Sequence, residues 1–128
     1  MIVLLDTSSP VCKLTFVEKD WHYSDEWQAD RELAKHLLAY LQEQLEKNGR
    51  TWNDLTGIGV FKGPGSFTGL RIGLTVLNTL ANTQEIPIIG ETGEAWRTKA
   101  LERLSRGEND KLVLPLYGSD AHITKPRK

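Results

Sequence analysis

Four glycines and one proline are concentrated between positions 63 and 73, in the segment Gly-Pro-Gly-Ser-Phe-Thr-Gly-Leu-Arg-Ile-Gly. Glycine loses more backbone freedom on folding than any other residue, so such a cluster indicates tight turns or a close approach of other atoms to the backbone. A short apolar run precedes the segment, and leucines at helical spacing follow it. The pattern therefore predicts a strand, a glycine loop and a helix in that order.

Three strands are expected near the N-terminus. Residues 2 to 5 form an apolar run, and residues 12 to 17 alternate between inward and outward positions with the two-residue period of a half-buried strand. A turn at residues 18 to 20 leads to a third strand that begins at Trp21 and is expected to be interrupted at residues 24 to 26. The order of these elements predicts an antiparallel meander.

Helices and strands alternate in the rest of the chain. Asp30 is expected to cap a helix whose leucines recur every four residues until residues 48 and 49 end it. The second helix follows the glycine segment, and a buried strand is expected at residues 86 to 89. A third helix at residues 93 to 105 and a final short strand at residues 112 to 116 complete the expected elements.

This order favours parallel pairing of the later strands through crossover connections. We predict an α/β fold in which a five-stranded mixed sheet contains a three-strand antiparallel meander followed by parallel crossover units, with helices on both faces. The order is similar to the ribonuclease-H-like half of actin-like ATPases, although a fold does not by itself assign a function. A single domain is expected at residues 1–117, followed by a basic C-terminal tail at residues 118–128.

Composition limits the classes of protein that need to be considered. A chain of 128 residues suits one globular domain, and its formal net charge of -1 gives no strong field for nucleic acid or an anionic membrane. The apolar start reaches Asp6 too early for a signal-peptide core, and no later stretch could span a bilayer. We therefore expect a cytoplasmic protein that does not contact membranes. The single cysteine, Cys12, allows no intrachain disulfide.

The glycine segment does not fit the two common phosphate-binding motifs. A P-loop needs a Lys-Ser or Lys-Thr pair after its last glycine, and none follows here. In a dinucleotide-binding fingerprint the second and third glycines are three residues apart, whereas Gly65 and Gly69 are four residues apart. The loop could instead present backbone amides at a helix N-terminus, capped by Ser66 or Thr68 with Arg71 one turn further, to hold an anion or dock a partner. The alternative is a tight turn packed on its own domain, and the residues alone slightly favour that turn.

Other reactive residues do not form a recognisable site. Asp6, Thr7 and Ser8 stand where ATPases of this architecture begin their phosphate loop, but a turn that satisfies its own backbone explains them equally well, and we favour that turn. No second carboxylate has a comparable place, so nuclease activity is not expected. His22, His36 and His122 are too scattered for a metal motif, and neither a metal nor a cofactor is expected. The charges at residues 125–128 predict a solubilising terminus.

Residues 63 to 73 resemble the hallmark of the TsaB family of tRNA threonylcarbamoyladenosine biosynthesis proteins, which are also described as glycoprotease-like. Residues 5–8 and 86–90 are similar to family patterns, and the resemblance covers roughly residues 1 to 105. It implies a cytoplasmic, non-catalytic scaffold for TsaD, the paralogue that transfers a threonylcarbamoyl group to the adenosine beside the anticodon of certain tRNAs. Gly93 and Arg97 stand where the catalytic paralogue has two metal-binding histidines, and neither would replace a histidine ligand.

The resemblance also implies a heterodimer in which the first and second helices pack against equivalent helices of a TsaD-like subunit. A TsaE-like ATPase in the same assembly, a homodimer and an indirect relation to tRNA are further implications. We expect a helix of another protein, rather than a substrate, to approach residues 63 to 73. The expected partner-binding residues are Gly63, Pro64, Gly65, Ser66, Phe67, Thr68, Gly69, Arg71, Thr75, Asn78 and His36.

One feature departs from the family pattern. Family members continue into a second lobe of the same architecture, whereas residues 115–117 and the basic tail are similar to the way family chains finish, so a shortened form is expected. A two-lobed nucleotide cleft could not form within one such chain, which leaves Asp6, Thr7 and Ser8 as a vestigial phosphate loop. The alternative functions are a minimal nucleotide-binding phosphotransferase that uses Asp6 and the glycine loop, and a self-associating structural module.

Overall fold

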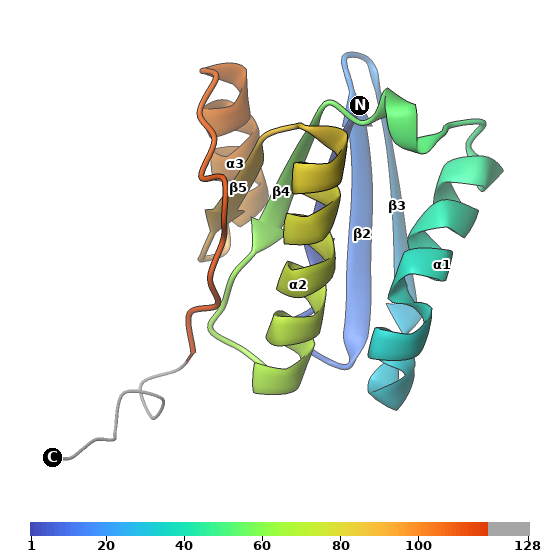
Figure 1. The fold of residues 1–128 in the computed structure, drawn as a ribbon, viewed down its shortest axis with the longest axis vertical. Helices are drawn as coiled ribbons and strands as arrows, with labels where there is room; N and C mark the ends of the chain where they lie inside the picture. Colours follow the sequence, from blue (N-terminus) through green and yellow to red (C-terminus); the bar gives the residue numbers. More distant parts are fainter. Residues whose placement is uncertain (118–128) are drawn as a thin grey trace, which may run out of the picture.

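The computed structural model describes residues 1–117, which fold around one five-stranded sheet (Figure 1). The tail expected at residues 118–128, with His122, lies outside the described residues. The strands are β1 (Ile2–Asp6), β2 (Val11–Glu18), β3 (Trp21–Gln28), β4 (Gly57–Phe61) and β5 (Ile88–Glu91). The helices are α1 (Leu33–Lys47), α2 (Phe67–Gln84) and α3 (Trp96–Ser105).

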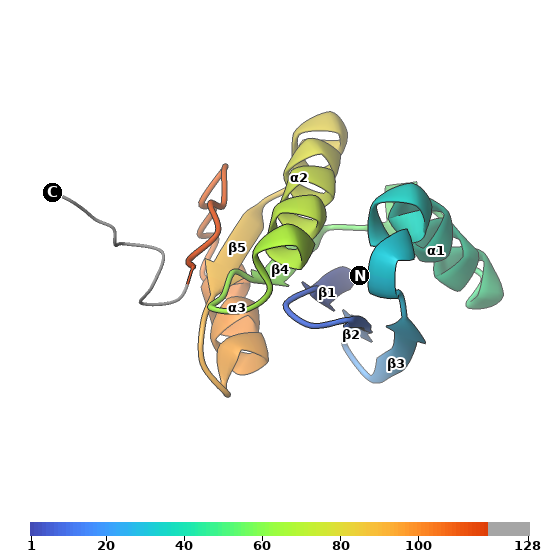
Figure 2. The same ribbon diagram turned by 90° about the horizontal axis from the view of Figure 1, so that it is seen from below.

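The sheet has the order β3-β2-β1-β4-β5 and is mixed. The pairs β1 with β2 and β2 with β3 are antiparallel, whereas β4 runs parallel to both β1 and β5. Helices α1 and α2 pack on one face of the sheet, and α3 packs on the other (Figure 2). The predicted fold class, with its meander, its parallel crossover units and its two helical layers, is therefore confirmed.

The interruption predicted within the third strand is wrong. Strand β3 is continuous, because residues 24 to 26 pair with residues 13 to 15 of β2. Successive side chains of a strand point to opposite faces, so an edge strand accepts polar residues on its solvent side. Glu26 lies opposite Lys13, a cross-strand pair of opposite charges that favours the strand.

The starts of two helices also differ from the prediction. Asp30 does not cap α1: it lies in a short 3-10 turn with φ of 49°, and its carboxylate accepts a hydrogen bond from Gln28 at 2.8 Å. The third helix begins at Trp96, three residues later than expected, because Gly93 adopts φ of 87°. The expected cap of α2 is confirmed for Ser66, whose hydroxyl oxygen accepts the backbone N–H of Gly69.

Each face of the sheet carries its own apolar core. The leucines of the predicted row on α2, Leu70, Leu74 and Leu77, are all buried, and Leu74 and Leu77 belong to the core beneath α1 and α2. The smaller core beneath α3 is built from Leu4, Ile89, Trp96 and Ala100. Burial of a leucine-sized side chain contributes roughly 1.5–3 kcal/mol relative to exposure, so these rows fix both helical layers on the sheet.

The final strand predicted at residues 112 to 116 is not formed. Residues 109–117, which we call the strap, run along the outer edge of β5 and then reach α2 (Figure 1). The backbone N–H of Asp110 donates to Ile88, and the N–H and carbonyl of Val113 both bond to the side chain of Asn78 at 2.9 Å. The Asn78 amide thus takes the backbone groups that a neighbouring strand would otherwise pair.

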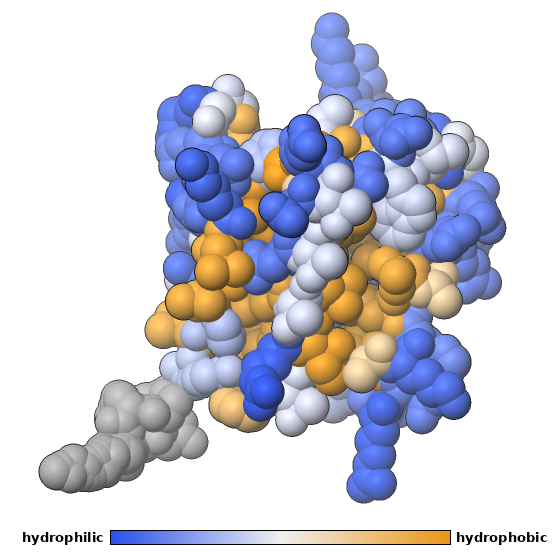
Figure 3. All heavy atoms as spheres, in the orientation of Figure 1, coloured by the Kyte–Doolittle hydropathy of each residue, from blue (hydrophilic) through white to orange (hydrophobic). Residues whose placement is uncertain are grey.

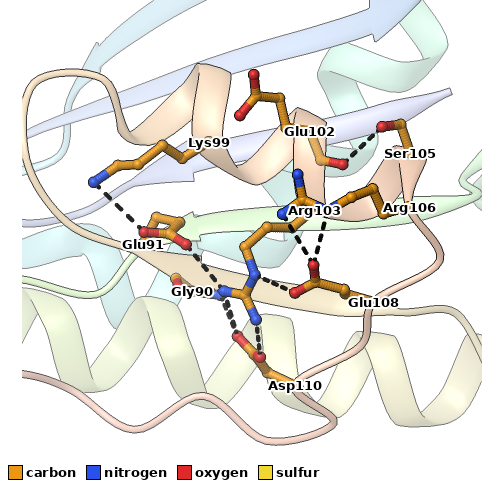
Figure 4. A network of polar contacts seen from close by, with 9 residues as sticks. All are labelled: Gly90, Glu91, Lys99, Glu102, Arg103, Ser105, Arg106, Glu108 and Asp110. Carbon is orange, nitrogen blue, oxygen red and sulfur yellow. Dashed lines mark hydrogen bonds and ion pairs between the residues drawn. The ribbon is translucent and has the colours of Figure 1, made fainter.

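An ion network ties the strap to α3 and β5 (Figure 4). The Arg103 guanidinium donates to Glu91 at 3.0 Å, to Glu108 at 2.7 Å and to Asp110. Arg103 and Arg106 hold the pKa of Glu108 below its ordinary value. Burial acts to raise the pKa of Asp110, but the N–H of Gly90 and the Arg103 guanidinium outweigh it, so that pKa is also lowered.

Acid should weaken the fold through this network. Both carboxyl groups have lower pKa values in the folded chain than their ordinary values of 4.5 for Glu108 and 3.8 for Asp110. Their contribution to stability is therefore present above those values and is lost as the pH falls through the lowered ones. We expect Arg103→Gln to lower the thermal midpoint by a few degrees at pH 7, and by less at pH 3, in circular dichroism melts.

Arg106→Gln is the matched control for this experiment. Arg106 is exposed and bonds to only one of the two carboxylates, Glu108 at 3.0 Å, so its loss should change the midpoint less at both pH values. An Arg103→Gln variant whose midpoint falls with pH as steeply as that of the wild type would contradict the assigned role.

Candidate partner-binding site

The space beside three of the glycines is filled by the loop that follows β1. A Cβ atom at Gly65 would lie 2.5 Å from the Cβ of Ser8. A Cβ at Gly69 would lie 2.2 Å from the carbonyl oxygen of Thr7, and one at Gly73 would lie 2.2 Å from the Thr7 hydroxyl. Thr7 is buried, and its hydroxyl donates to the Gly69 carbonyl at 2.8 Å. The start of α2 therefore packs directly on this loop.

The fourth crowded glycine meets the strap. Gly63 has φ of 124°, and a Cβ there would lie 2.0 Å from the carbonyl oxygen of Leu116. The chain itself thus approaches all four glycines, which differs from the expected approach by another protein's helix. The loop after β1 must pass beneath the N-terminus of α2, and only residues without a Cβ leave it room.

The candidate phosphate loop has the geometry of a self-satisfied turn. The backbone N–H of Ser8 donates to the Asp6 carboxylate at 2.8 Å.

The other candidate reactive groups in the described part of the chain do not form a catalytic or metal site. Burial, and then the charges of Asp6 and Asp25, raise the pKa of the Cys12 thiol to about 12, so this thiol is protonated and not nucleophilic at neutral pH. Among residues 1–117, no three His, Cys, Asp or Glu side chains are grouped so that they could hold a metal ion.

The exposed part of the glycine segment carries an aromatic cluster. Phe67 is 51% exposed, and its ring lies 4.4 Å from that of Tyr117, measured between centroids. The Arg71 guanidinium lies 5.1 Å from the Phe67 ring centroid, within cation–π range. Pro64, Ser66 and Thr68 are also exposed, so this end of α2 presents mixed polar and aromatic chemistry.

A groove separates α1 from α2 on the face turned away from the sheet. We call it the interhelical groove. Two adjoining hollows of about 470 and 400 Å³ form it. Leu38 of α1 is 55% exposed beside it. Its main apolar lining residues are Ala34, Leu38, Trp52, Ile72, Val76 and Leu80, and Thr75 and Thr79 border it on α2.

A second groove lies on the other side of α2, between this helix and the strap. We call it the strap groove. Its volume is about 310 Å³, and Leu112 and Leu114 border it with exposures of 60% and 67%. Figure 3 shows apolar surface on both sides of a pale ridge that follows α2. Thr75 and Thr79 of α2 line both grooves.

The predicted partner-binding residues outside residues 63–69 divide into three groups. Arg71 and Thr75 are exposed on this face, which a contact with a partner would require. Asn78 is half-buried and bonds to the strap instead of pointing outward. His36 is exposed, lies 3.3 Å from Glu32, and lines neither groove.

Sequence reasoning missed the leucines that border the grooves. Leu38 lies beside the leucine stripe of α1 at helical spacing, which is typical of a core position, whereas its side chain is exposed. Leu112 and Leu114 alternate with the buried Val113, which is the two-residue period of a strand. No neighbouring element of residues 1–117 covers Leu112 and Leu114, so both side chains are exposed.

The geometry defines a class of protein. It is an α/β lobe with a ribonuclease-H-like sheet, and exposed apolar side chains of α1, α2 and the strap border two grooves on one of its faces. The described helices include none that is long and apolar enough to cross a membrane.

Comparisons with known proteins agree with this class. The family model of TsaD, described as tRNA N6-adenosine threonylcarbamoyltransferase, matches residues 27–93, which is more than half of the chain. The chain therefore belongs to the TsaD-like family, and within it resembles the TsaB proteins.

Two TsaB relatives illustrate the likeness. The tRNA threonylcarbamoyladenosine biosynthesis protein TsaB of Buchnera aphidicola (subspecies Baizongia pistaciae) is 33% identical over 86 residues, covering 67% of this chain and 39% of the relative. That of Escherichia coli is 28% identical over 109 residues, covering 80% of this chain and 47% of the relative. The chain thus spans about half the length of the curated relatives it matches.

Solved structures show the same fold. YeaZ from Pseudomonas aeruginosa superposes with a TM-score of 0.67 at 26% identity, covering 77% of this chain and 49% of that one. A crystal structure of an uncharacterized Pseudomonas aeruginosa protein with similarity to peptidase YeaZ gives a TM-score of 0.68 at 28% identity, covering 73% and 44% of the two chains.

Proposed function

We propose that this chain takes part in tRNA threonylcarbamoyladenosine biosynthesis as a non-catalytic partner of a TsaD-like transferase. The observation that carries the proposal is the interhelical groove, where apolar side chains of α1 and α2 are exposed together. Apolar grooves between helices suit the apolar face of another helix. The names of the TsaB relatives supply the pathway, and the match to the TsaD model supplies a partner of similar architecture.

The side chains that could carry chemistry support a non-catalytic role. The Asp6 carboxylate accepts a backbone hydrogen bond, Thr7 is buried against α2, and the Cys12 thiol has a raised pKa. The alternative phosphotransferase would need Asp6 to serve a bound nucleotide. Calorimetry with ATP and magnesium separates the two functions, because the scaffold is expected to show no tight binding.

Reconstitution tests the proposal directly. The cognate TsaD-like subunit would be assayed for threonylcarbamoyladenosine in tRNA, measured by mass spectrometry of nucleosides, with and without this chain. We expect modification to depend on the chain, with a catalytic subunit that is stable alone but inactive or slow. Equal modification in both reactions would refute the scaffold function.

Arg71→Glu should weaken the heterodimer at least about 10-fold, because Arg71 lies at one end of both grooves and its charge would reverse. The measurement is the dissociation constant for the TsaD-like subunit by calorimetry. Lys19→Glu is the matched control, since it makes the same charge change at an exposed residue between β2 and β3. Equal binding by the wild type and Arg71→Glu would exclude this face.

A further inference from the structure

We propose that the strap groove is part of the same partner-binding surface as the interhelical groove, so that the TsaD-like partner contacts α1, α2 and the strap together. Asn78 is then a positioning residue that acts through the strap. This inference rests on the proposed function of the α1–α2 face, which it extends to a third element.

The two grooves adjoin along α2 and share lining residues. Thr75 lines both of them, as does Thr79, and only the ridge of α2 separates them. Figure 3 shows this ridge as a pale band with apolar surface on each side. Threonine side chains are short, so an apolar partner seated in the interhelical groove can pass over the ridge and reach the strap without a gap.

The strap directs two large apolar side chains to solvent. Leu112 and Leu114 are 60% and 67% exposed, while Val113 between them is 3% exposed and faces the core. The chain's own core therefore uses only one of these three side chains. Neighbouring exposed leucines that border a groove mark an interaction surface rather than scattered apolar exposure.

The strap is held in place before any partner arrives. The Asn78 side chain bonds to both backbone groups of Val113 at 2.9 Å. The N–H of Leu116 donates to Lys62 at 2.7 Å, and that of Asp110 donates to Ile88 at 2.9 Å. A surface fixed at three points loses little freedom on binding, which is how a preorganised segment adds to affinity.

The size of the face supports a third element. Helices of 15 and 18 residues are about 22 and 27 Å long, and side by side they span about 20 Å. A stable interface buries about 800 Å² per partner, which corresponds to a patch about 28 Å on a side. Two helices alone are narrower than this, and the strap adds exposed apolar side chains beside α2.

The proposed occupant is the TsaD-like subunit, because one partner that spans the ridge of α2 would contact both grooves. Its matching surface would carry apolar side chains on both sides of a shallow furrow that receives the threonine ridge. Arg71 lines both grooves near the N-terminus of α2, so an acidic side chain of the partner would complement that end.

The double variant Leu112→Ser/Leu114→Ser tests the strap. We expect its affinity for the TsaD-like subunit to fall at least about 10-fold in calorimetry. Its thermal midpoint should stay near that of the wild type, because both side chains are exposed. Leu116→Ser is the matched control, since Leu116 is 48% exposed on the same strap but does not border the groove. Equal losses in the control and the double variant would overturn the inference, as would no loss in either.

Asn78→Ala tests positioning through the strap. We expect it to speed hydrogen exchange at the Val113 amide and to weaken binding, but to add less than about 2-fold to the loss caused by the two leucine changes. Fully additive losses would mean that Asn78 contacts the partner itself and would overturn its positioning role.

Failure of the proposed function has a different signature, because the wild type would then not bind the TsaD-like subunit at all. Light scattering of the isolated chain measures whether it self-associates, which tests a second copy of the chain as the occupant. If the leucine changes abolish self-association while leaving the heterodimer intact, the strap serves a second copy of this chain and the inference is overturned.

Discussion

Gly69→Ala should destabilise the protein by about 2–3 kcal/mol, even though alanine favours a helix over glycine by roughly 1 kcal/mol. The new Cβ would lie 2.2 Å from the carbonyl oxygen of Thr7. That obstacle is backbone, so no side-chain rotation can relieve it, and α2 must move away from the loop after β1. The free energy of unfolding from urea titrations, followed by circular dichroism, measures the loss.

Two further glycines serve as controls for this effect. Gly49 has φ of 69° and nothing within 4 Å of an added Cβ, so Gly49→Ala should cost only the backbone strain of about 1–2 kcal/mol. At Gly73 the obstacle is the side chain of Thr7, so Thr7→Ala should recover part of the loss caused by Gly73→Ala. A Gly69→Ala protein as stable as the wild type would show that the loop after β1 is not packed as described.

Leu38→Asp should weaken the heterodimer with the TsaD-like subunit by about 100-fold while leaving the fold intact. Leu38 is 55% exposed, so its replacement removes little core packing. A charge in the interhelical groove, however, would have to lose its water when an apolar partner binds, and this cost is large at the centre of an interface. Calorimetric titration measures the affinity, and thermal melts check the fold.

His22→Asp is the matched control because it places the same carboxylate at an exposed position of β3, away from both grooves. Its affinity should stay within about 2-fold of the wild type. If Leu38→Asp bound as tightly as this control, the interhelical groove would not be the binding surface.

Periodicity predicted most of the fold because it reports which side of an element faces a core. The alternation in β2 and the four-residue spacing of leucines in α1 are local patterns, and the structure confirms both. The cap at Ser66 was also predictable, because a capping side chain bonds to the backbone of its own turn and is therefore a local feature.

Features that depend on distant neighbours could not be predicted in this way. The polar middle of β3 is a strand because β2 supplies its partners. Residues 112 to 116 are not a strand because the side chain of Asn78, more than 30 positions away, takes the backbone groups of Val113. The exposure of Leu38 likewise depends on how α1 sits beside α2.

The glycine segment shows the same division. The sequence by itself indicated tight turns or a close approach of other atoms at residues 63 to 73, because glycine is costly to order and this segment contains four. Only the tertiary structure decided what approaches them: Thr7 and Ser8, some 60 positions earlier, and the carbonyl of Leu116. The spacing of residues is a local property of the chain. The atoms that fill a gap are brought together only by the packed sheet and helices, and that packing leaves apolar side chains of α1 and the strap exposed beside α2.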